Sequence, residues 1–122
     1  MSIKKRSKGV LALCAALGLS FSSGLAQVNS WTNPGSGAWE ENDWSLGILP
    51  DSSQSIMITN AGYKAIGISP WTRADYPNSM TVSNLTVSAP TNGSHTLLLN
   101  YFGTGTPLEI LGDCTMLSLL RR

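Results

Sequence analysis

This sequence of 122 residues has few charged side chains, one histidine and two cysteines. Charged residues make up 12% of the chain, so most of its polar side chains are neutral. A single histidine excludes a site built from several histidines, and a Ser–His–Asp triad would depend on that one residue. Four of the eight basic residues lie within the first eight positions, so the rest of the chain lacks the basic patch that is typical of nucleic-acid binding.

The N-terminus combines a basic start with an uncharged apolar run. Four basic residues precede the segment 10–21, which has no charged side chain. Gly24 and Ala26 then place small side chains at the −3 and −1 positions of a cleavage site between Ala26 and Gln27. This order of segments is typical of a secretory signal peptide. We therefore expect residues 1–26 to be removed and the mature chain to be secreted or exposed at the cell surface.

Two other interpretations fit this segment less well. A membrane-spanning helix needs about 20 apolar residues, and the run 10–21 is shorter. A lipoprotein signal would use Cys14, but the large side chain of Leu13 precedes it. We therefore predict no membrane span in the mature chain.

Removal of residues 1–26 changes the charge and the cysteine content. The remaining 96 residues carry four basic and seven acidic side chains, a net charge of −3. Cys114 is then the one cysteine left, which excludes an intrachain disulfide. We expect Cys114 to be a small buried apolar residue, with pairing between two chains as the alternative. Stability must come from packing in one small domain.

After Pro50 the chain contains short runs in which apolar and polar residues alternate. A period of two residues is typical of strands with one buried face. The predicted strands are residues 55–59, 64–69, 80–88, 96–100 and 107–111. The preceding segment is rich in Asn, Ser, Gly, Pro and Trp and fits no helical pattern. We therefore predict an all-β chain, with a Trp-rich leader over residues 27–54 and strand repeats over residues 55–122.

Leucines in these strands recur at a regular interval. Leu85 and Leu97 are 12 positions apart, and Leu108 follows after 11 more. Strand and turn units that repeat in this way are typical of the stacked coils of a solenoid. A small antiparallel β-sandwich also has strands at this spacing. The spacing alone leaves both architectures open.

The leader carries a more specific pattern. Its tryptophans, glycine and proline precede an alternating strand: Trp31, Trp39, Trp44, Gly47, Pro50, Ile56 and Ile58. This pattern resembles the start of the passenger region in bacterial autotransporter-like and related extracellular β-solenoid proteins. The segments Asn84-Leu-Thr-Val-Ser88 and Thr96-Leu-Leu-Leu99 are similar to the rungs of those proteins. The resemblance implies a short right-handed β-solenoid start with a Trp-rich N-terminal cap.

Two features depart from that family. Residues 70–77 interrupt the rung pattern, and the sequence ends after about three repeats, whereas family members are much longer. We therefore expect a truncated chain in which residues 117–120 begin another rung. A degenerate C-terminal sorting tail over residues 106–122 is the alternative, although Asp113 lies within its apolar part.

The aromatic residues suggest two roles. We expect Trp31, Trp39 and Trp44 to form the structural cap, because large aromatic side chains can cover an otherwise open sheet end. Trp71 and Tyr76 lie in the polar insertion and are the candidate carbohydrate-binding residues, since exposed aromatic rings can stack on sugar rings. Extracellular polysaccharide is the partner that this pair implies.

The sequence offers little for catalysis. Glu40, Glu41 and Asp43 fall in one loop, where solvated turn residues are the usual explanation, and His95 precedes a strand where we expect it to be solvated. We predict no enzymatic activity, no cofactor, no metal and no nucleic-acid partner. The expected function is a secreted or cell-surface structural or adhesive β-solenoid segment. A carbohydrate-binding module and the N-terminal fragment of a polysaccharide-degrading enzyme are the alternatives.

Overall fold

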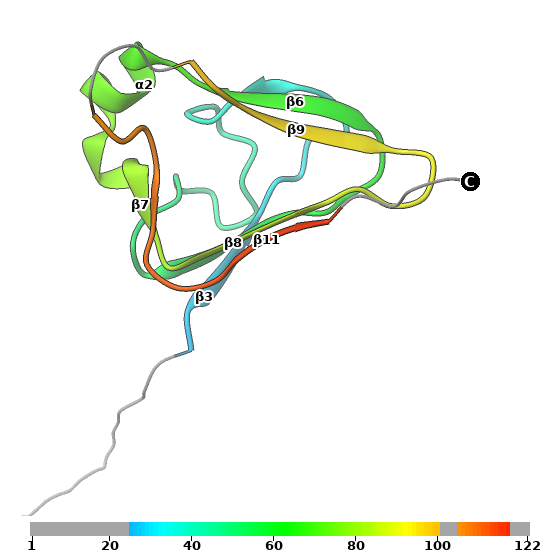
Figure 1. Ribbon diagram of the computed structural model, residues 1–122, viewed down its shortest axis with the longest axis horizontal. Coiled ribbons are helices and arrows are strands. Elements are labelled where there is room, and N and C mark those ends of the chain that lie inside the picture. Colours follow the sequence, from blue (N-terminus) through cyan, green and yellow to red (C-terminus); the bar gives the residue numbers. More distant parts are fainter. Residues whose placement is uncertain (1–24, 101–104, 118–122) are drawn as a thin grey trace, which may run out of the picture.

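The computed structural model describes residues 25–100 and 105–117 (Figure 1). The predicted signal peptide therefore lies outside the described residues except for its last two positions, and so do residues 118–120 of the predicted further rung. The described elements are strands β3 (Gln27–Ser30), β4 (Gly37–Ala38), β5 (Gln54–Ile58), β6 (Tyr63–Ile68), β7 (Thr81–Val82), β8 (Asn84–Ser88), β9 (Ser94–Leu99), β10 (Glu109–Ile110) and β11 (Cys114–Leu117), helix α2 (Pro70–Asp75) and 3₁₀ helix η1 (Pro77–Met80).

The strands form three parallel sheets around a common interior (Figure 1). Their orders are β11-β8-β5-β3, β4-β6-β9 and β10-β7. Every pairing between the described strands is parallel, and the antiparallel contact is an isolated bridge between Trp31 and Trp44. The prediction of an all-β chain is confirmed, whereas the antiparallel sandwich is wrong for the part of the chain that is described.

The order of the strands repeats along the chain. β5, β6 and β7 lie one in each sheet, and β8, β9 and β10 follow in the same order and pair with them. Ser55 lies beside Asn84, 29 positions later. Leu85 lies beside Ile56, and Leu97 lies beside Ile66 in another sheet. The predicted stacking of leucines every 11 or 12 residues is therefore wrong, because that interval separates one sheet from the next.

Alternation along the strands forms the core. In β5, Gln54, Ile56 and Ile58 are buried and the residues between them are half-buried, and β6 and β8 repeat this pattern. The buried apolar residues are Trp31, Trp39, Trp44, Ile56, Ile58, Ile66, Ile68, Met80, Val82, Leu85 and Val87. Full burial of one such aliphatic side chain contributes about 1.5–3 kcal/mol. The alternation read from the sequence therefore identifies the inward faces of these strands correctly.

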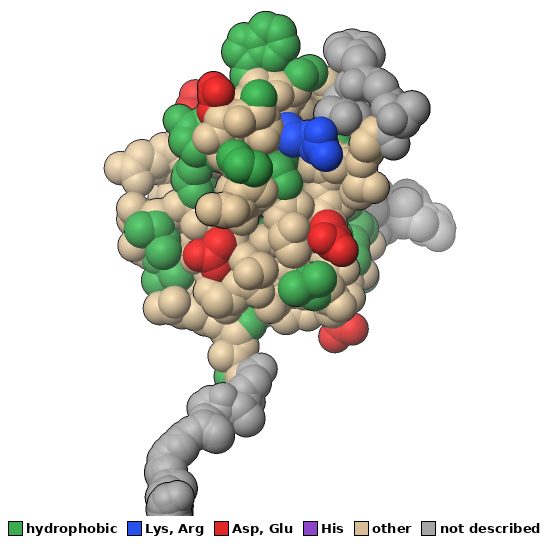
Figure 2. All heavy atoms as spheres, turned by 90° about the vertical axis from the view of Figure 1, so that its left-hand side faces the viewer, with side chains coloured by type: hydrophobic (Ala, Val, Ile, Leu, Met, Phe, Trp, Pro, Cys, Tyr) green, Lys and Arg blue, Asp and Glu red, His purple; other side chains and the backbone are tan. Residues whose placement is uncertain are grey.

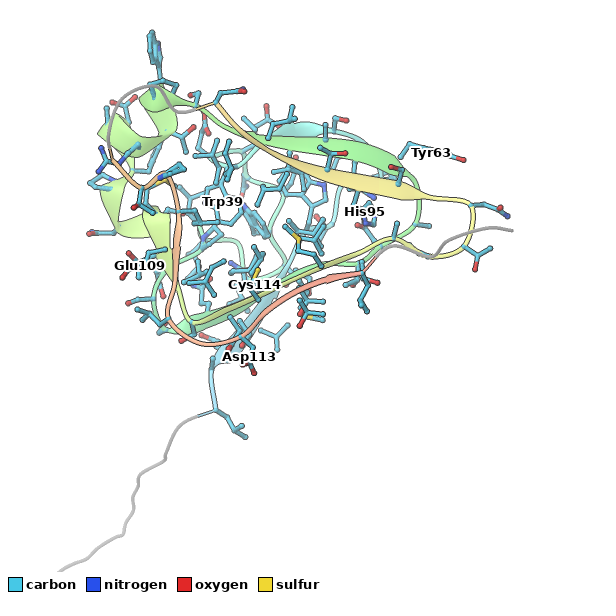
Figure 3. All side chains as sticks on the ribbon, in the orientation of Figure 1. Trp39, Tyr63, His95, Glu109, Asp113 and Cys114 are labelled. Carbon is cyan, nitrogen blue, oxygen red and sulfur yellow. The ribbon has the colours of Figure 1, made fainter. Side chains whose placement is uncertain are left out.

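The leader belongs to this core instead of lying outside it. β3 pairs with β5 and β4 pairs with β6, so residues 27–54 supply two strands to the sheets. The rings of Trp31 and Trp39 both pack edge-on against Trp44, with centroids 5.1 and 5.2 Å away. The indole nitrogen of Trp39 donates to Ser79 Oγ (2.8 Å), and that of Trp44 donates to the carbonyl of Trp39 (2.9 Å). Figure 3 shows Trp39 enclosed between the sheets.

The insertion at residues 70–77 is helical, which the sequence analysis missed. Ser69 and Thr72 form a capping box, in which Ser69 Oγ accepts from the Thr72 amide (3.2 Å) and Thr72 Oγ1 accepts from the Ser69 amide (3.0 Å). Pro70 occupies the first turn, where its missing N–H costs nothing. Ser-Pro-x-Thr is the signal that would have predicted α2. The two helices connect β6 to β7 and lie outside the sheets (Figure 1).

Candidate functional site

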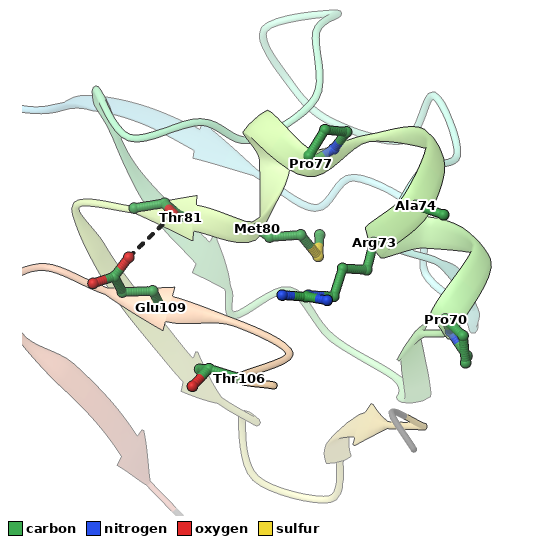
Figure 4. A pocket seen from close by; sticks show the side chains of 8 residues that line it. All are labelled: Pro70, Arg73, Ala74, Pro77, Met80, Thr81, Thr106 and Glu109. Atoms are coloured by element: carbon green, nitrogen blue, oxygen red, sulfur yellow. Dashed lines mark hydrogen bonds between the residues drawn. The ribbon is translucent and has the colours of Figure 1, made fainter. Parts of the chain in front are cut away.

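A groove of about 690 Å³ lies between the helical insertion and the strands β7 and β10 (Figure 4). It is lined by Pro70, Arg73, Ala74, Pro77, Met80, Thr81, Thr106 and Glu109. Arg73 comes from the last turn of α2, and Glu109 lies beside Thr81 in the parallel pair of β10 and β7. The capping box that begins α2 and the β7–β10 register therefore fix the two walls of the groove.

The groove combines charged and apolar groups. Thr81 Oγ1 donates a hydrogen bond to Glu109 Oε1 (3.3 Å), and the Arg73 side chain extends into the space beside them (Figure 4). Pro70, Pro77 and Met80 supply apolar surface. A guanidinium donates hydrogen bonds and a carboxylate accepts them, so together they suit a ligand with several hydroxyl groups. Figure 2 views this side of the molecule and shows only scattered charged side chains among neutral ones.

The structure separates the two predicted carbohydrate-binding residues. Trp71 lies on α2 with 72% of its surface exposed, and Tyr76 ends that helix with 42% exposed. Five helical positions correspond to about 140° around a helix axis, so the two side chains do not leave α2 in the same direction. Tyr76 lines a second cavity of about 270 Å³ that Trp71 does not line. Neither residue lines the groove, although Trp71 is the sequence neighbour of Pro70, which does.

The predicted cap residues are all buried. Trp31, Trp39 and Trp44 are 2%, 0% and 4% exposed. None of them is available for stacking on a ligand. Their side chains fill the interior beside β3 and β4, and the indole N–H group of each donates a hydrogen bond within the protein.

A buried lysine and the histidine form a polar cluster that the sequence analysis missed. Lys64 on β6 is 4% exposed, and it lies beside His95 on β9 in the parallel register. Its Nζ donates to the carbonyls of Asn60 (3.2 Å) and Ala61 (2.8 Å), and it lies 2.9 Å from His95 Nε2. His95 is half-buried on a strand, so the expectation of a solvated histidine is wrong (Figure 3). Lys64 lies two and four positions before Ile66 and Ile68, and alternate residues of a strand face the same side. This spacing could have predicted that Lys64 is buried.

The electrostatics of this cluster favour a charged lysine beside a neutral histidine. Burial lowers the pKa of Lys64. Burial and, secondly, the charge of Lys64 lower the pKa of His95. Three acceptors around Nζ match the three protons of an ammonium group, so Nε2 accepts and the ring proton lies on Nδ1. His95 Nδ1 and Asn60 Oδ1 are buried without a hydrogen-bond partner.

The cluster is suited to holding a turn. A Cβ atom at Gly62, where φ is +113°, would collide with the carbonyl oxygen of Pro34, so the turn between β5 and β6 is tightly packed. Lys64 ties that turn to β9 through the contacts above. A lysine with a lowered pKa can act as a nucleophile. Lys64, however, is almost fully buried and lines neither the groove nor the second cavity.

The acidic loop residues have structural contacts. Glu40 Oε1 accepts a hydrogen bond from Thr72 Oγ1 (2.7 Å), and Asp43 Oδ2 accepts one from Asn33 Nδ2 (3.1 Å). Within residues 25–100 and 105–117, no group of three or more His, Cys, Asp and Glu side chains could hold a metal ion. The same ranges contain no helix that is long and apolar enough to cross a membrane.

Cys114 differs from its expected environment. It lies on β11 and is exposed, so the prediction of a buried cysteine is wrong. The register places it beside Leu85, which is buried, but β11 is the outermost strand of its sheet. The side chain of Cys114 therefore faces inward, but no further strand among the described residues lies over it.

Comparison with known proteins gives no relative: no family model, curated protein or solved structure matches the chain.

Proposed function

We propose that this chain is an exported, non-catalytic β-solenoid segment that serves as a structural or adhesive element outside the cytoplasm. The observation that carries the proposal is the repeated parallel register. Partners in the three sheets are 27–31 positions apart, as in Gln27 with Gln54, Tyr63 with Ser94 and Thr81 with Glu109. When a chain passes through all three sheets and returns to the first one beside its earlier strand, each turn stacks on the previous turn.

Inward ladders support this architecture. Ile56 lies beside Leu85, and Ile66 lies beside Leu97, so apolar side chains stack on apolar side chains from turn to turn. A polar ladder runs alongside them, where Asn84 Nδ2 donates to Ser55 Oγ (2.9 Å) and Asn84 Oδ1 accepts from the Asp113 amide (2.8 Å). Crossovers between parallel strands are almost always right-handed, so we propose a right-handed solenoid.

Disulfide trapping tests the stacking. In a Cys114→Ser background, Met57→Cys with Thr86→Cys should form a crosslink, because these residues are direct partners in β5 and β8. Thr86→Cys with Leu98→Cys keeps the 12-residue interval but lies in two different sheets, and it should not crosslink. Equal crosslinking of both pairs would overturn the solenoid.

Export is tested separately. The full-length chain, expressed in a bacterium, should appear outside the cytoplasm with Gln27 as its first residue, as N-terminal sequencing would determine. Replacement of the four basic residues before Gly9 by neutral ones should reduce export, because the charged start is part of the targeting signal. A full-length protein that remains in the cytoplasm would contradict this part of the proposal.

Carbohydrate binding is a second candidate, favoured by the groove that contains Arg73 and Glu109 and by the exposed Trp71 next to it in sequence. Arg73→Met and Trp71→Ala should each weaken glycan-array binding. Tyr63→Ala is the matched control, since Tyr63 is 71% exposed and lies on β6 instead of the insertion. Binding that is absent, or that survives both substitutions in the insertion, would rule out this function for the groove.

A further inference from the structure

Lys64 connects two successive turns of the chain. Its Nζ donates to the carbonyls of Asn60 and Ala61, which lie between β5 and β6, and it is 2.9 Å from His95 Nε2 on β9. Lys64 and His95 are direct partners in the parallel register of β6 and β9. One ammonium group therefore holds the start of β9 against the turn that precedes β6.

The contact between Lys64 and His95 requires a neutral imidazole. Nε2 can accept a hydrogen bond from the ammonium only while it carries no proton. A second proton on the ring makes Nε2 a donor, so the hydrogen bond is lost and two positive charges face each other at this short distance. Protonation of His95 thus replaces an attraction by a repulsion.

Within the described part of the chain, the segments around His95 hold no carboxylate that could offset this repulsion. β9 packs against β6 and β8. β8 and the turns 59–62 and 89–93 have no ionisable side chain, and β6 has Lys64 and Tyr63. Tyr63 is 71% exposed and precedes Lys64 directly, so it faces the opposite side of the strand. Lys64 is therefore the one charged group that faces His95 from these segments.

The cluster also contains two polar atoms that gain from being opened to water. His95 Nδ1 and Asn60 Oδ1 are buried without a hydrogen-bond partner. A buried group in this state has lost the hydrogen bonds that water would supply. His95 is half-buried, so its ring has a short path to solvent (Figure 3). Hydration of these atoms therefore favours an open arrangement once the bond from Lys64 is lost.

The two ends of β9 are held unequally. At its start, the Ser94 amide donates to the carbonyl of Gly62 over 3.3 Å. Just beyond its other end, the Asn100 amide donates to the carbonyl of Ile68 over 2.9 Å. The start of β9 thus combines the longer backbone hydrogen bond with the contact that depends on the protonation of His95.

We propose that Lys64 and His95 form an acid-sensitive switch, which releases the start of β9, residues 92–97, when His95 takes up a proton. The imidazolium then moves toward solvent, while Lys64 keeps its two carbonyl partners. The pairing of β5 with β8 in another sheet is unaffected. The switch does not depend on export or on glycan binding, so its failure leaves the proposed function standing.

Hydrogen exchange of the purified chain, followed by mass spectrometry and corrected for the direct effect of pH on exchange, tests the switch. Protection of residues 92–97 should fall at least tenfold between pH 7.5 and pH 5. Residues 54–58 and 84–88 should keep their protection, because β5 and β8 belong to the sheet that lacks His95. The comparison separates a local release from a general loss of stability.

Two variants assign the release to this histidine. His95→Gln should keep residues 92–97 protected at both pH values, because a glutamine oxygen can accept from Lys64 and does not titrate. Thr96→His, added to His95→Gln, is the matched control. Thr96 is exposed and follows His95 on β9, so a histidine there titrates but faces away from Lys64. It should not restore the sensitivity to acid.

Three results would overturn the proposal. One is a wild-type chain in which residues 92–97 are equally protected at both pH values. Another is a release by acid that persists in His95→Gln or returns with Thr96→His. The third is an equal loss of protection in all strands, which would be global unfolding by acid. Circular dichroism at pH 7.5 checks that both variants retain their strands.

Discussion

Two buried polar clusters lie in the same interior, and they are built differently. Asn29 is saturated: its Nδ2 donates to the carbonyl of Ile48 and to Gln54 Oε1, both at 2.9 Å, and its Oδ1 accepts from the Leu46 amide at 3.0 Å. The Lys64 cluster is charged and incomplete, because His95 Nδ1 and Asn60 Oδ1 have no partner. A buried neutral network that is fully bonded stabilises a fold, whereas a buried charge contributes little net stability.

The largest effect should follow from Asn29→Ala. This substitution leaves the buried Gln54 Oε1 and the partly buried Leu46 amide and Ile48 carbonyl without a partner, and each buried unsatisfied group costs about 1–3 kcal/mol. We expect the free energy of unfolding to fall by about 3 kcal/mol, measured by urea denaturation. Asn78→Ala, at an exposed position in η1, should change it by less than about 0.5 kcal/mol. A small effect at Asn29 would remove the contrast between the clusters.

Lys64→Met should have a smaller effect than Asn29→Ala. The substitution leaves the carbonyls of Asn60 and Ala61 unpaired, but it also removes a buried charge and adds apolar contacts to Ile66 and Ile68 on the same face. Replacing a buried charged group by an apolar one of similar size is often close to neutral. Urea denaturation at pH 7 should therefore give a change of less than about 1.5 kcal/mol. A larger loss would show that the lysine contacts dominate stability on this side.

The pH dependence should be the smallest and most specific effect. The folded chain holds the pKa of His95 below 6.5, so the unfolded chain binds the proton more tightly. Stability should consequently fall as the pH drops below 6.5 toward the folded pKa, and His95→Gln should reduce that slope. NMR titration measures this directly, because His95 is the one histidine in the chain. Lys64→Met should raise the measured pKa toward its usual value, and an unchanged pKa would contradict the assigned contact.

The sequence predicts local features better than long-range ones. Alternation around Ile56, Ile66 and Leu85 identifies strands and their inward faces, because a strand's period is set by its own residues. The partner of each strand is about 29 positions away, because each turn crosses three sheets. The interval of 12 residues between leucines separates one sheet from the next, so it is not the structural repeat. α2 escaped prediction because its six residues are too few to show an amphipathic pattern.

The candidate site was only partly predictable. Trp71 and Tyr76 are exposed in the insertion, as a binding role requires, yet the helix separates them. Arg73 and Glu109 are 36 positions apart and share the groove only because α2 lines one side of it and β10, which pairs with β7, lines the other. Nothing in the spacing of these two residues indicates that they share a surface. The burial of Lys64, by contrast, follows from the sequence, because Lys64, Ile66 and Ile68 are alternate residues of one strand and face the same side.

The parallel register also governs how this chain folds. Each pairing between the described strands joins residues 27–31 positions apart, so none of these pairs can form through a tight hairpin. Closing a loop of that length costs about 3 kcal/mol of chain entropy before the first contact forms, and folds dominated by such contacts form slowly. A slowly folding chain keeps its strand edges unpaired for longer, and during that time these edges can pair with other chains. The same register that stacks the turns thus sets how long the chain is open to misassembly while it folds.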